Sequence, residues 1–273
     1  MTDWIAALPM YNVTPALADH WRSLVHDTVV ALDERTLRVR IVEPNDIGPT
    51  LTSLWTRPDL LLSQTCGYPL LRVLPSSIQI VATPIFDIEG CEGPRYSSVL
   101  VVSRAALARG ATSLAQCRGL RAAYNEPHSN SGMNLLRGAV APLARDGRFF
   151  GAVVETGSHR NSLQALIDDT ADIAAIDCVT FAFAQTIPDI ANAGLTVIGF
   201  TKRTAGLPLI ASAAVTPDVL DDLRQALDQA LESAPARART LHLKGFARLT
   251  RDDYAEIGAI EDEAIAMGYS RLA

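Results

Sequence analysis

The chain has 273 residues, of which 48% are hydrophobic and 20% charged, so it can bury a large core and is not intrinsically disordered. Its formal net charge of −6 excludes a protein that binds nucleic acid through a basic surface. No apolar run reaches the roughly 18–20 residues that cross a bilayer, so we expect no direct insertion into a membrane.

The first part of the chain alternates strand-like and helix-like segments. Residues 5–8 are apolar and predict a strand. Thr14 and Pro15 then predict a helix start, because Thr suits the cap and Pro the first helical position. The further expected elements are strands at 37–42, 59–63 and 78–82, a short helix at 45–55 and a polar loop at 64–68.

A second alternating series follows a β-rich run at 96–102. Its expected strands are 120–124, 151–155, 173–176, 195–200 and 209–215, and its expected helices are 129–144, from 158, 178–185, from 216 and 250–267. The two series predict an α/β fold of two lobes with mixed, mainly parallel sheets. Residues 1–98 and 200–273 form a discontinuous first lobe, and residues 99–199 form the second.

The four cysteines are far apart, form no CxxC pair and have no zinc-type spacing with histidine. They predict reduced, mostly buried thiols and no metal site. The sequence also lacks the GxxxxGK[ST], GxGxxG, HExxH and GxSxG motifs. We therefore expect no cofactor and assign no catalytic residue.

The polar stretch 125–134 lies between an expected strand and an expected helix. The first turn of a helix has unpaired N–H groups and a partial positive charge. With the side chains of Ser129, Asn130 and Ser131, this turn is suited to hold an oxyanion without any lysine. The alternative is that these residues only cap the helix.

A second strand-to-helix turn, residues 155–162, has the same layout and contains His159. Its imidazole is expected to donate to an oxyanion, more strongly when protonated. The alternative is a surface histidine near a helix start. Both turns follow strands, and ligands of open α/β sheets bind at the carboxyl ends of strands, which favours a site.

Further candidates follow other expected strands. Asp177 ends the strand 173–176 and is placed either to accept from a ligand or to cap the next helix. In the first lobe, the loop residues that are candidates to cover or hydrogen-bond a ligand are Tyr11, Thr65, Cys66, Gly67 and Tyr68. For each tyrosine taken singly, core or interface packing is the favoured alternative.

Three segments, 129–132, 157–166 and 171–180, resemble the phosphate and phosphonate substrate-binding proteins of ABC importers, the PhnD-like group of type 2 periplasmic binding proteins. The resemblance runs in order along almost the whole chain and is densest at 120–182. It implies two α/β lobes, a hinge of two crossing strands and a ligand cleft between the lobes.

The resemblance also implies roles for the candidate residues. The oxyanion contacts fall on Ser129, Asn130, Ser131 and His159, and the acidic contact to the far end of the ligand falls on Asp177. The first-lobe contacts fall on Tyr11 and residues 65–68. The chain departs from the family where Asn130 stands in place of a usual hydroxyl residue.

The expected function is capture of a small oxyanionic ligand, phosphonate or phosphate, with an ABC permease as partner. The alternatives are a cytoplasmic lyase or synthase on the same fold, which turnover would reveal, and a ligand-sensing module, which ligand-dependent association would reveal. Residues 1–8 have no signal-peptide pattern, so the location is periplasmic by the resemblance or cytoplasmic if Met1 is the true start.

Overall fold

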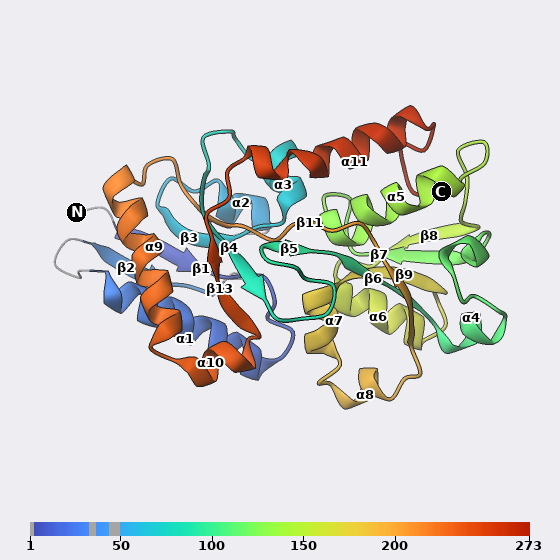
Figure 1. Ribbon diagram of the computed structural model, residues 1–273, viewed down its shortest axis with the longest axis horizontal. Coiled ribbons are helices and arrows are strands. Elements are labelled where there is room, and N and C mark those ends of the chain that lie inside the picture. The colour runs from blue at the N-terminus through green and yellow to red at the C-terminus, as the bar shows by residue number, and fades with distance from the viewer. Residues whose placement is uncertain (1–2, 33–36, 44–49) are drawn as a thin grey trace. The chain divides into compact units, whose positions relative to one another are not determined.

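The computed structural model describes residues 3–32, 37–43 and 50–273, and the chain forms two compact units (Figure 1). Unit 1 comprises Met1–Asp87, Glu92–Pro94 and Ala205–Tyr254, and unit 2 comprises Ile88–Cys91, Arg95–Thr204 and Ala255–Ala273. Strands β5 (Arg95–Tyr96) and β11 (Thr204–Ala205) pair where the chain passes from one unit to the other. The two-lobed α/β class is confirmed.

Unit 1 contains a six-stranded mixed sheet in the order β13-β4-β12-β3-β1-β2. The strands are β1 (Asp3–Ala7), β2 (Arg38–Ile41), β3 (Leu60–Gln64), β4 (Gln79–Phe86), β12 (Leu209–Ala211) and β13 (Leu243–Ala247). Strands β1 to β4 point in one direction, and β12 and β13 run against them. The helices are α1 (Pro15–Ala31), α2 (Leu51–Trp55), α3 (Gly67–Arg72), α9 (Pro217–Glu232), α10 (Pro235–Thr240) and a 3-10 turn, η5 (Asp252–Tyr254).

Helix α1 begins where the sequence predicts. The Thr14 hydroxyl accepts a hydrogen bond from the amide of Leu17 at 3.2 Å, and Pro15 is the first helical residue. The apolar stripe that includes Trp21 and Leu24 is buried, and α1 packs against α9 and the sheet (Figure 1). Local capping and the 3.6-residue period thus agree with the tertiary packing.

Two predictions for unit 1 need correction or restriction, and one strand was not predicted. The expected loop 64–68 is wrong in part, because β3 runs to Gln64 and α3 begins at Gly67 with a buried first turn. Strand β13 is absent from the prediction because it has no clear alternation; its pairing with β4 makes it a strand. The expected helix 45–55 is observed only as α2, and residues 44–49 lie outside the described residues.

Unit 2 contains a five-stranded sheet in the order β10-β6-β9-β7-β8. The strands are β6 (Ser98–Val102), β7 (Arg121–Tyr124), β8 (Ala152–Glu155), β9 (Ile173–Asp177) and β10 (Thr196–Phe200). Strands β7, β8 and β9 are parallel, and β6 runs against β9 and β10. The helices are α4 (Arg104–Ala108), α5 (Leu135–Val140), α6 (His159–Ile167), α7 (Cys178–Ala184), α8 (Pro188–Ala191) and α11 (Ala255–Ala266), with 3-10 turns η2 (Leu114–Cys117) and η4 (Ala141–Leu143).

The helix expected over 129–144 is not a single α-helix. It opens with a π-helical turn, η3 (Asn130–Asn134), in which the amide of Asn134 bonds to the carbonyl of Ser129 at 3.1 Å, five residues back. The helix continues as α5 and ends in the 3-10 turn η4. π-Helical turns are rare and are concentrated at functional sites.

The C-terminal helix α11 belongs to unit 2, whereas the predicted division put residues 200–273 in the first lobe. The Asn134 side chain donates to the carbonyl of Ile257 at 2.9 Å, and Arg137 forms an ion pair with Glu261 at 3.0 Å. Gly138 lets the helices approach, because a Cβ there would lie 2.5 Å from the Ile260 side chain. These contacts with α5 are long-range and have no local sequence signal.

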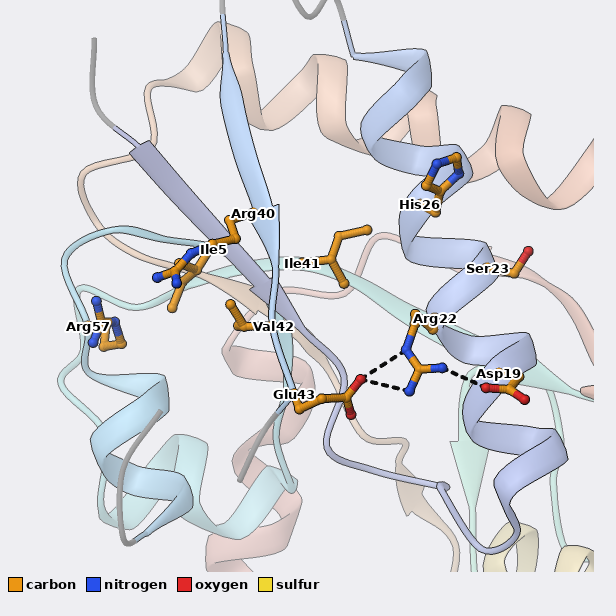
Figure 2. A pocket seen from close by; sticks show the side chains of 10 residues that line it. All are labelled: Ile5, Asp19, Arg22, Ser23, His26, Arg40, Ile41, Val42, Glu43 and Arg57. Carbon is orange, nitrogen blue, oxygen red and sulfur yellow. Dashed lines mark hydrogen bonds and ion pairs between the residues drawn. The ribbon is translucent and has the colours of Figure 1, made fainter. Parts of the chain in front are cut away.

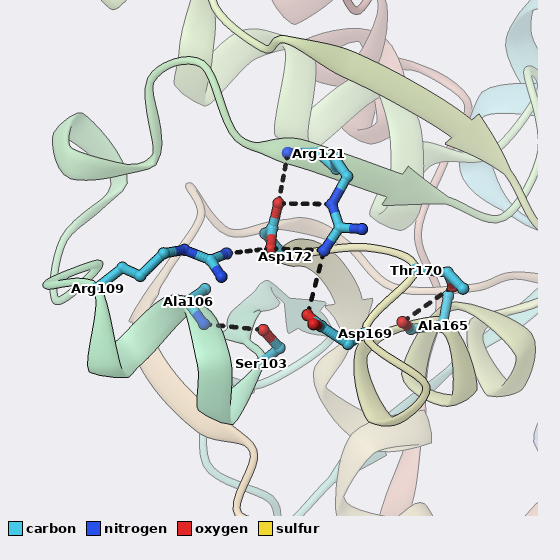
Figure 3. Close-up of polar contacts among 8 residues, drawn as sticks. All are labelled: Ser103, Ala106, Arg109, Arg121, Ala165, Asp169, Thr170 and Asp172. Carbon is cyan, nitrogen blue, oxygen red and sulfur yellow. Dashed lines mark hydrogen bonds and ion pairs between the residues drawn. The ribbon is translucent and has the colours of Figure 1, made fainter.

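The amino ends of β7 and β9 are joined by an ion-pair network around the buried Asp172 (Figure 3). Its carboxylate accepts from the backbone amide of Arg121 at 2.8 Å, from the guanidinium of Arg121 at 3.0 Å and from Arg109. Burial alone raises the pKa of Asp172, but the hydrogen bonds from the two arginines outweigh it and hold the pKa below its usual value.

In the part of the chain that the structure describes, no helix is both long and apolar enough to cross a membrane.

Candidate functional site

The two turns singled out in the sequence are neighbours in unit 2. Strands β7 and β8 are parallel, and Tyr124 lies opposite Glu155 in their register, so the turns leave the same edge of the sheet. The amide of Gly157 donates to the carbonyl of Asn125 at 2.7 Å, which joins the turns just beyond the strands. The structure thus brings the two predicted turns together, and we call them the paired turns.

Ser129 and Ser131 are both buried in the first of the paired turns. Ser129 is the cap of the π-helix, and its hydroxyl accepts from the amide of Gly132 at 2.9 Å. Amide groups in the first turn of a helix have no acceptor within that helix, so this turn presents N–H donors beside the two hydroxyls.

His159 on α6 contacts the other turn directly. Its Nε2 lies 2.8 Å from the Ser131 hydroxyl, whereas its Nδ1 is buried and has no hydrogen-bond partner. Burial lowers the pKa of His159 to about 4, so the imidazole is neutral at pH 7. The expectation of a donor strengthened by protonation therefore does not hold near neutral pH.

The side chain of Asn130 is fully buried and supports the turn from inside unit 2. Its Nδ2 donates to the hydroxyls of Tyr96 at 3.1 Å and Thr204 at 3.0 Å, and its Oδ1 accepts from Asn134 at 3.0 Å. These bonds give the Asn130 side chain a positioning role. A serine or threonine hydroxyl at this position could not make all three, because it has a single donor hydrogen.

Asp177 is 2% exposed at the carboxyl end of β9. Its Oδ1 accepts from the amides of Val179 at 2.8 Å and Thr180 at 3.0 Å, so it caps α7. The capping alternative that the sequence left open is therefore realised, and a ligand contact by Asp177 stays a prediction.

The first-lobe candidates all lie in unit 1. Tyr11 has a φ of 65°, and its buried ring packs against Trp21 and Phe86 with centroid distances of 6.2 and 5.4 Å. The other four first-lobe candidates, residues 65–68, lie at the start of α3. Thr65 and Tyr68 are buried, Gly67 begins the helix and Cys66 is its partly exposed cap. Their ligand contacts also stay predictions.

Asn125 is a residue of the paired turns that the sequence analysis did not single out. Its Oδ1 is buried without a hydrogen-bond partner. A Cβ added to Gly132 would lie 1.9 Å from this oxygen and 3.1 Å from Cε1 of His159. Unpartnered buried polar atoms are uncommon, and two of them, on Asn125 and His159, border Gly132. Asn125 directly follows a strand, which is the one signal that could have found it.

The paired turns do not form a Ser–His–carboxylate relay. Such a relay needs a carboxylate at the second ring nitrogen of the histidine to orient it. Nδ1 of His159 has no partner, and the Oδ1 of Asp177 accepts from backbone amides. Among the described residues, no group of three or more His, Cys, Asp or Glu side chains is placed to hold a metal ion.

A pocket of about 670 Å³ lies in unit 1 beside α1 and β2 (Figure 2). Ile5, Ile41 and Val42 contribute apolar surface to it. Of its lining arginines, Arg22 is paired with Asp19 at 2.6 Å and with Glu43 at 2.7 Å, and Arg57 is paired with Asp59 at 2.7 Å. The pocket contains none of the predicted site residues.

A family model described as the periplasmic substrate-binding protein of phosphonate ABC transporters matches residues 57–254. A search of curated proteins found no match.

Several solved structures are similar over nearly the whole chain. PhnD1 from Prochlorococcus marinus, in complex with methylphosphonate, is 16% identical with a TM-score of 0.74, covering 96% of this chain and 98% of that one. A binding-protein component of an ABC phosphonate transporter from Pseudomonas aeruginosa is 16% identical with a TM-score of 0.72, covering 97% and 87%. XAC2383 from Xanthomonas citri, bound to ATP, is 17% identical with a TM-score of 0.70, covering 98% and 99%. At these identities the structures show a shared fold.

Proposed function

The chain belongs to the family of periplasmic substrate-binding proteins of phosphonate ABC transporters, and from this premise we propose that its paired turns bind the phosphonate group of a small ligand. The observation that carries the proposal is the joining of the turns by the hydrogen bonds Gly157–Asn125 and Ser131–His159. This arrangement places two hydroxyls and the amide ends of two helices at one edge of the unit 2 sheet.

The donor set suits an oxyanion that is recognised without a formal positive charge. The hydroxyls of Ser129 and Ser131 and the first-turn amides are neutral donors, and the helix N-terminus adds a partial positive charge. His159 is neutral at pH 7 as well. Tetrahedral oxyanions such as phosphonate and phosphate offer three or four oxygen atoms, enough to accept from both turns at once.

We assign His159 the role of orienting Ser131. If Nε2 of the neutral imidazole carries the proton, it donates to the Ser131 oxygen across their 2.8 Å contact. The Ser131 hydrogen then points away from the imidazole and is available to the ligand. In this tautomer Nδ1 is a buried acceptor without a hydrogen-bond partner.

The proposed partner in transport is an ABC permease. The family is the small-ligand binding component of such transporters, so the ligand-loaded chain would deliver its ligand to the permease. A neighbouring permease or ATPase gene, or ligand-dependent association with a reconstituted permease, would support this part of the proposal. Ligand binding without any effect on a cognate permease would contradict it.

The ligand is tested by isothermal titration of the full chain with methylphosphonate, phosphate, methanesulfonate and acetate. We expect methylphosphonate to bind more tightly than the sulfonate and the carboxylate. Ser129→Ala is expected to weaken binding by about 1–3 kcal/mol, because it removes one hydrogen bond to a charged group. The absence of binding to all four compounds would contradict the proposal.

A matched control is Ser103→Ala. Ser103 is also a buried capping serine of unit 2, and its hydroxyl accepts from the amide of Ala106 at 3.1 Å. It follows β6, whose Val102 pairs with Ile173 at the amino end of β9, so it lies at the opposite edge of the sheet. Equal losses of affinity in Ser103→Ala and Ser129→Ala would show that the loss is not specific to the paired turns.

A further inference from the structure

Two of the four cysteines lie in contact although they are 87 positions apart in the chain. The Sγ atoms of Cys91 and Cys178 are 3.5 Å apart within unit 2. Cys91 is partly exposed, on the short segment Ile88–Cys91 that follows a crossing from unit 1. Cys178 is buried at the first position of α7, directly after Asp177.

The backbone on both sides holds the two thiols together. The Ser97 hydroxyl donates to the carbonyl of Gly90 at 3.0 Å, and the Ser97 carbonyl accepts from the amide of Cys178 at 3.1 Å. Gly90 has a φ of +96°, and a Cβ there would lie 2.9 Å from Cβ of Cys178. Ser97 therefore binds Gly90, the neighbour of Cys91, and the backbone of Cys178 itself, so the approach of the two cysteines does not depend on the thiols alone.

From this geometry we propose that Cys91 and Cys178 are a covalent modification site and form a disulfide when the protein meets an oxidant. A disulfide needs sulfur atoms about 2.05 Å apart on Cβ atoms about 3.5–4.5 Å apart. The sulfur atoms must move about 1.5 Å closer to form the bond, and the backbone of Gly90, next to Cys91, already lies against Cβ of Cys178. The inference is independent of the proposed ligand.

The other two cysteines differ from this pair. Cys117 is fully buried, its thiol donates to the carbonyl of Ser113 at 3.4 Å, and burial raises its pKa to about 11. Cys66 lies in unit 1, on the cap of α3. All four cysteines lie in the described residues, and the structure records a contact between sulfur atoms only for Cys91 and Cys178.

The chemistry is thiol–disulfide exchange with a small-molecule or protein disulfide as oxidant. The thiolate of the accessible Cys91 attacks one sulfur of the oxidant, forms a mixed disulfide and releases one thiol of the oxidant. The thiolate of Cys178 then attacks the Cys91 sulfur and releases the second thiol. Two protein thiols lose two electrons and two protons, and the oxidant disulfide becomes two thiols.

The second step is expected to be the slow one. The hydrogen bond with Cys91 and burial raise the pKa of the Cys178 thiol, so little thiolate is present at neutral pH. The rate of cross-linking should therefore increase with pH. The family is described as periplasmic, and disulfides form and persist in that compartment.

The product would fasten the segment Ile88–Cys91 to the start of α7, beside the Asp177 cap. It would also close a loop of 87 positions in the unfolded chain, which reduces the conformational entropy of that state. We expect the melting temperature of the oxidised protein to exceed that of the reduced protein by about 10 °C.

The test is to incubate the reduced full-length chain with glutathione disulfide and to map its peptides by mass spectrometry without reduction. We expect one linked pair of peptides, containing Cys91 and Cys178 and lighter by two hydrogen atoms, and a fall from four free thiols to two after denaturation. Wild-type protein in which Cys91 is found only as a glutathione adduct, or linked to Cys66 or Cys117, would overturn the proposal.

Two variants complete the experiment. Cys66→Ser should still form the cross-link and gain thermal stability on oxidation. Cys178→Ser should keep Cys91 as the glutathione adduct and show no such gain. A linked peptide in the wild type without any rise in melting temperature would overturn the inference that the folded geometry accommodates the bond.

Discussion

At the amino ends of β7 and β9, the Asp172 carboxylate is bonded to two guanidinium groups and a backbone amide, as Figure 3 shows. At the carboxyl ends of the same strands, the paired turns carry neutral hydroxyl, amide and imidazole groups. There Asn125 and His159 each keep a buried polar atom without a partner. The first region is satisfied internally, whereas the second combines hydroxyl and first-turn amide donors with two buried polar atoms that have no partner.

We infer that the two ends of this sheet have different roles: the Asp172 network stabilises the fold, and the paired turns bind the ligand. A buried carboxylate with several donors stabilises the fold and offers nothing to a ligand. Unsatisfied buried polar atoms cost stability, and in the assigned tautomer those of Asn125 and His159 are acceptors that an oxyanion does not satisfy, so the contrast rests on the hydroxyl and amide donors of the paired turns. Four experiments, from the largest expected effect to the smallest, would sharpen or break this contrast.

The largest effect is expected for Asp172→Ala. It removes a 2% exposed carboxylate and leaves Arg109 and Arg121 without their buried acceptor, so we expect a loss of about 3 kcal/mol in the free energy of unfolding. Denaturant unfolding measures it. Asp169→Asn is the control, because Asp169 is 56% exposed, pairs with the same Arg121 and has a φ of 53°, which asparagine adopts more readily than alanine; it should cost less than about 0.5 kcal/mol. Equal losses in both variants would refute the assignment.

Gly132→Ala should disturb the paired turns through crowding. The added Cβ overlaps Oδ1 of Asn125 and presses on His159, so we expect about 1–3 kcal/mol of destabilisation together with weakened ligand binding. Gly245→Ala is the control, since a Cβ there meets nothing within 4 Å. If Gly132→Ala and Gly245→Ala had the same free energy of unfolding and the same ligand affinity, the tight packing around Gly132 would not matter for stability or for binding.

Ser131→Ala should weaken ligand binding by about 1–2 kcal/mol and also cost about 1 kcal/mol of stability, because Nε2 of the buried His159 loses its hydrogen-bond partner. Ser103→Ala should cost about 1 kcal/mol of stability through the lost cap and leave affinity unchanged. Calorimetry for affinity and thermal unfolding for stability are needed on both variants. A stability loss without an affinity loss in Ser131→Ala would contradict the contrast.

The last experiment measures how the free energy of unfolding changes with pH, through His159 in one region and Asp172 in the other. At pH 7 its expected effect is the smallest of the four. The folded-state pKa of His159 is lowered from 6.5 to about 4, so between these values the unfolded state binds the proton and stability falls as the pH falls. The lowered pKa of Asp172 adds a further loss only below about pH 4. We therefore expect the free energy of unfolding, measured from pH 8 to pH 3, to lose its pH dependence between about pH 6.5 and pH 4 in His159→Gln. In Asp172→Ala it should lose the additional decrease below about pH 4. If the free energy of unfolding depended on pH in the same way in the wild type and in His159→Gln, burial would not lower the pKa of His159.

Much of the secondary structure could be predicted because its causes are local. Thr14 with Pro15 begins α1, Ser158 caps α6 and Thr216 caps α9, each with a hydrogen bond to an amide three residues on. The segments 129–132 and 157–166 carried the family resemblance for the same reason. They are continuous in sequence, and their polar residues directly follow strands.

The geometry of the candidate site depended on contacts between distant residues. Asn130 is a predicted ligand contact, and only the tertiary structure shows that its side chain also bonds Tyr96 and Thr204; the ligand contact stays a prediction. The neutrality of His159 comes from burial, which no pattern around residue 159 reveals.

The sequence by itself determined the α/β class, most strands and capped helices, and the resemblance to phosphonate-binding proteins, because propensity, capping and periodicity act within a few residues of each other. Only the tertiary structure decided the π-helical turn of Asn130–Asn134, the place of α11 in unit 2, and the contacts Ser131–His159 and Cys91–Cys178. These features arise where segments far apart in the chain pack together, and packing fixes side-chain direction, burial and charge state.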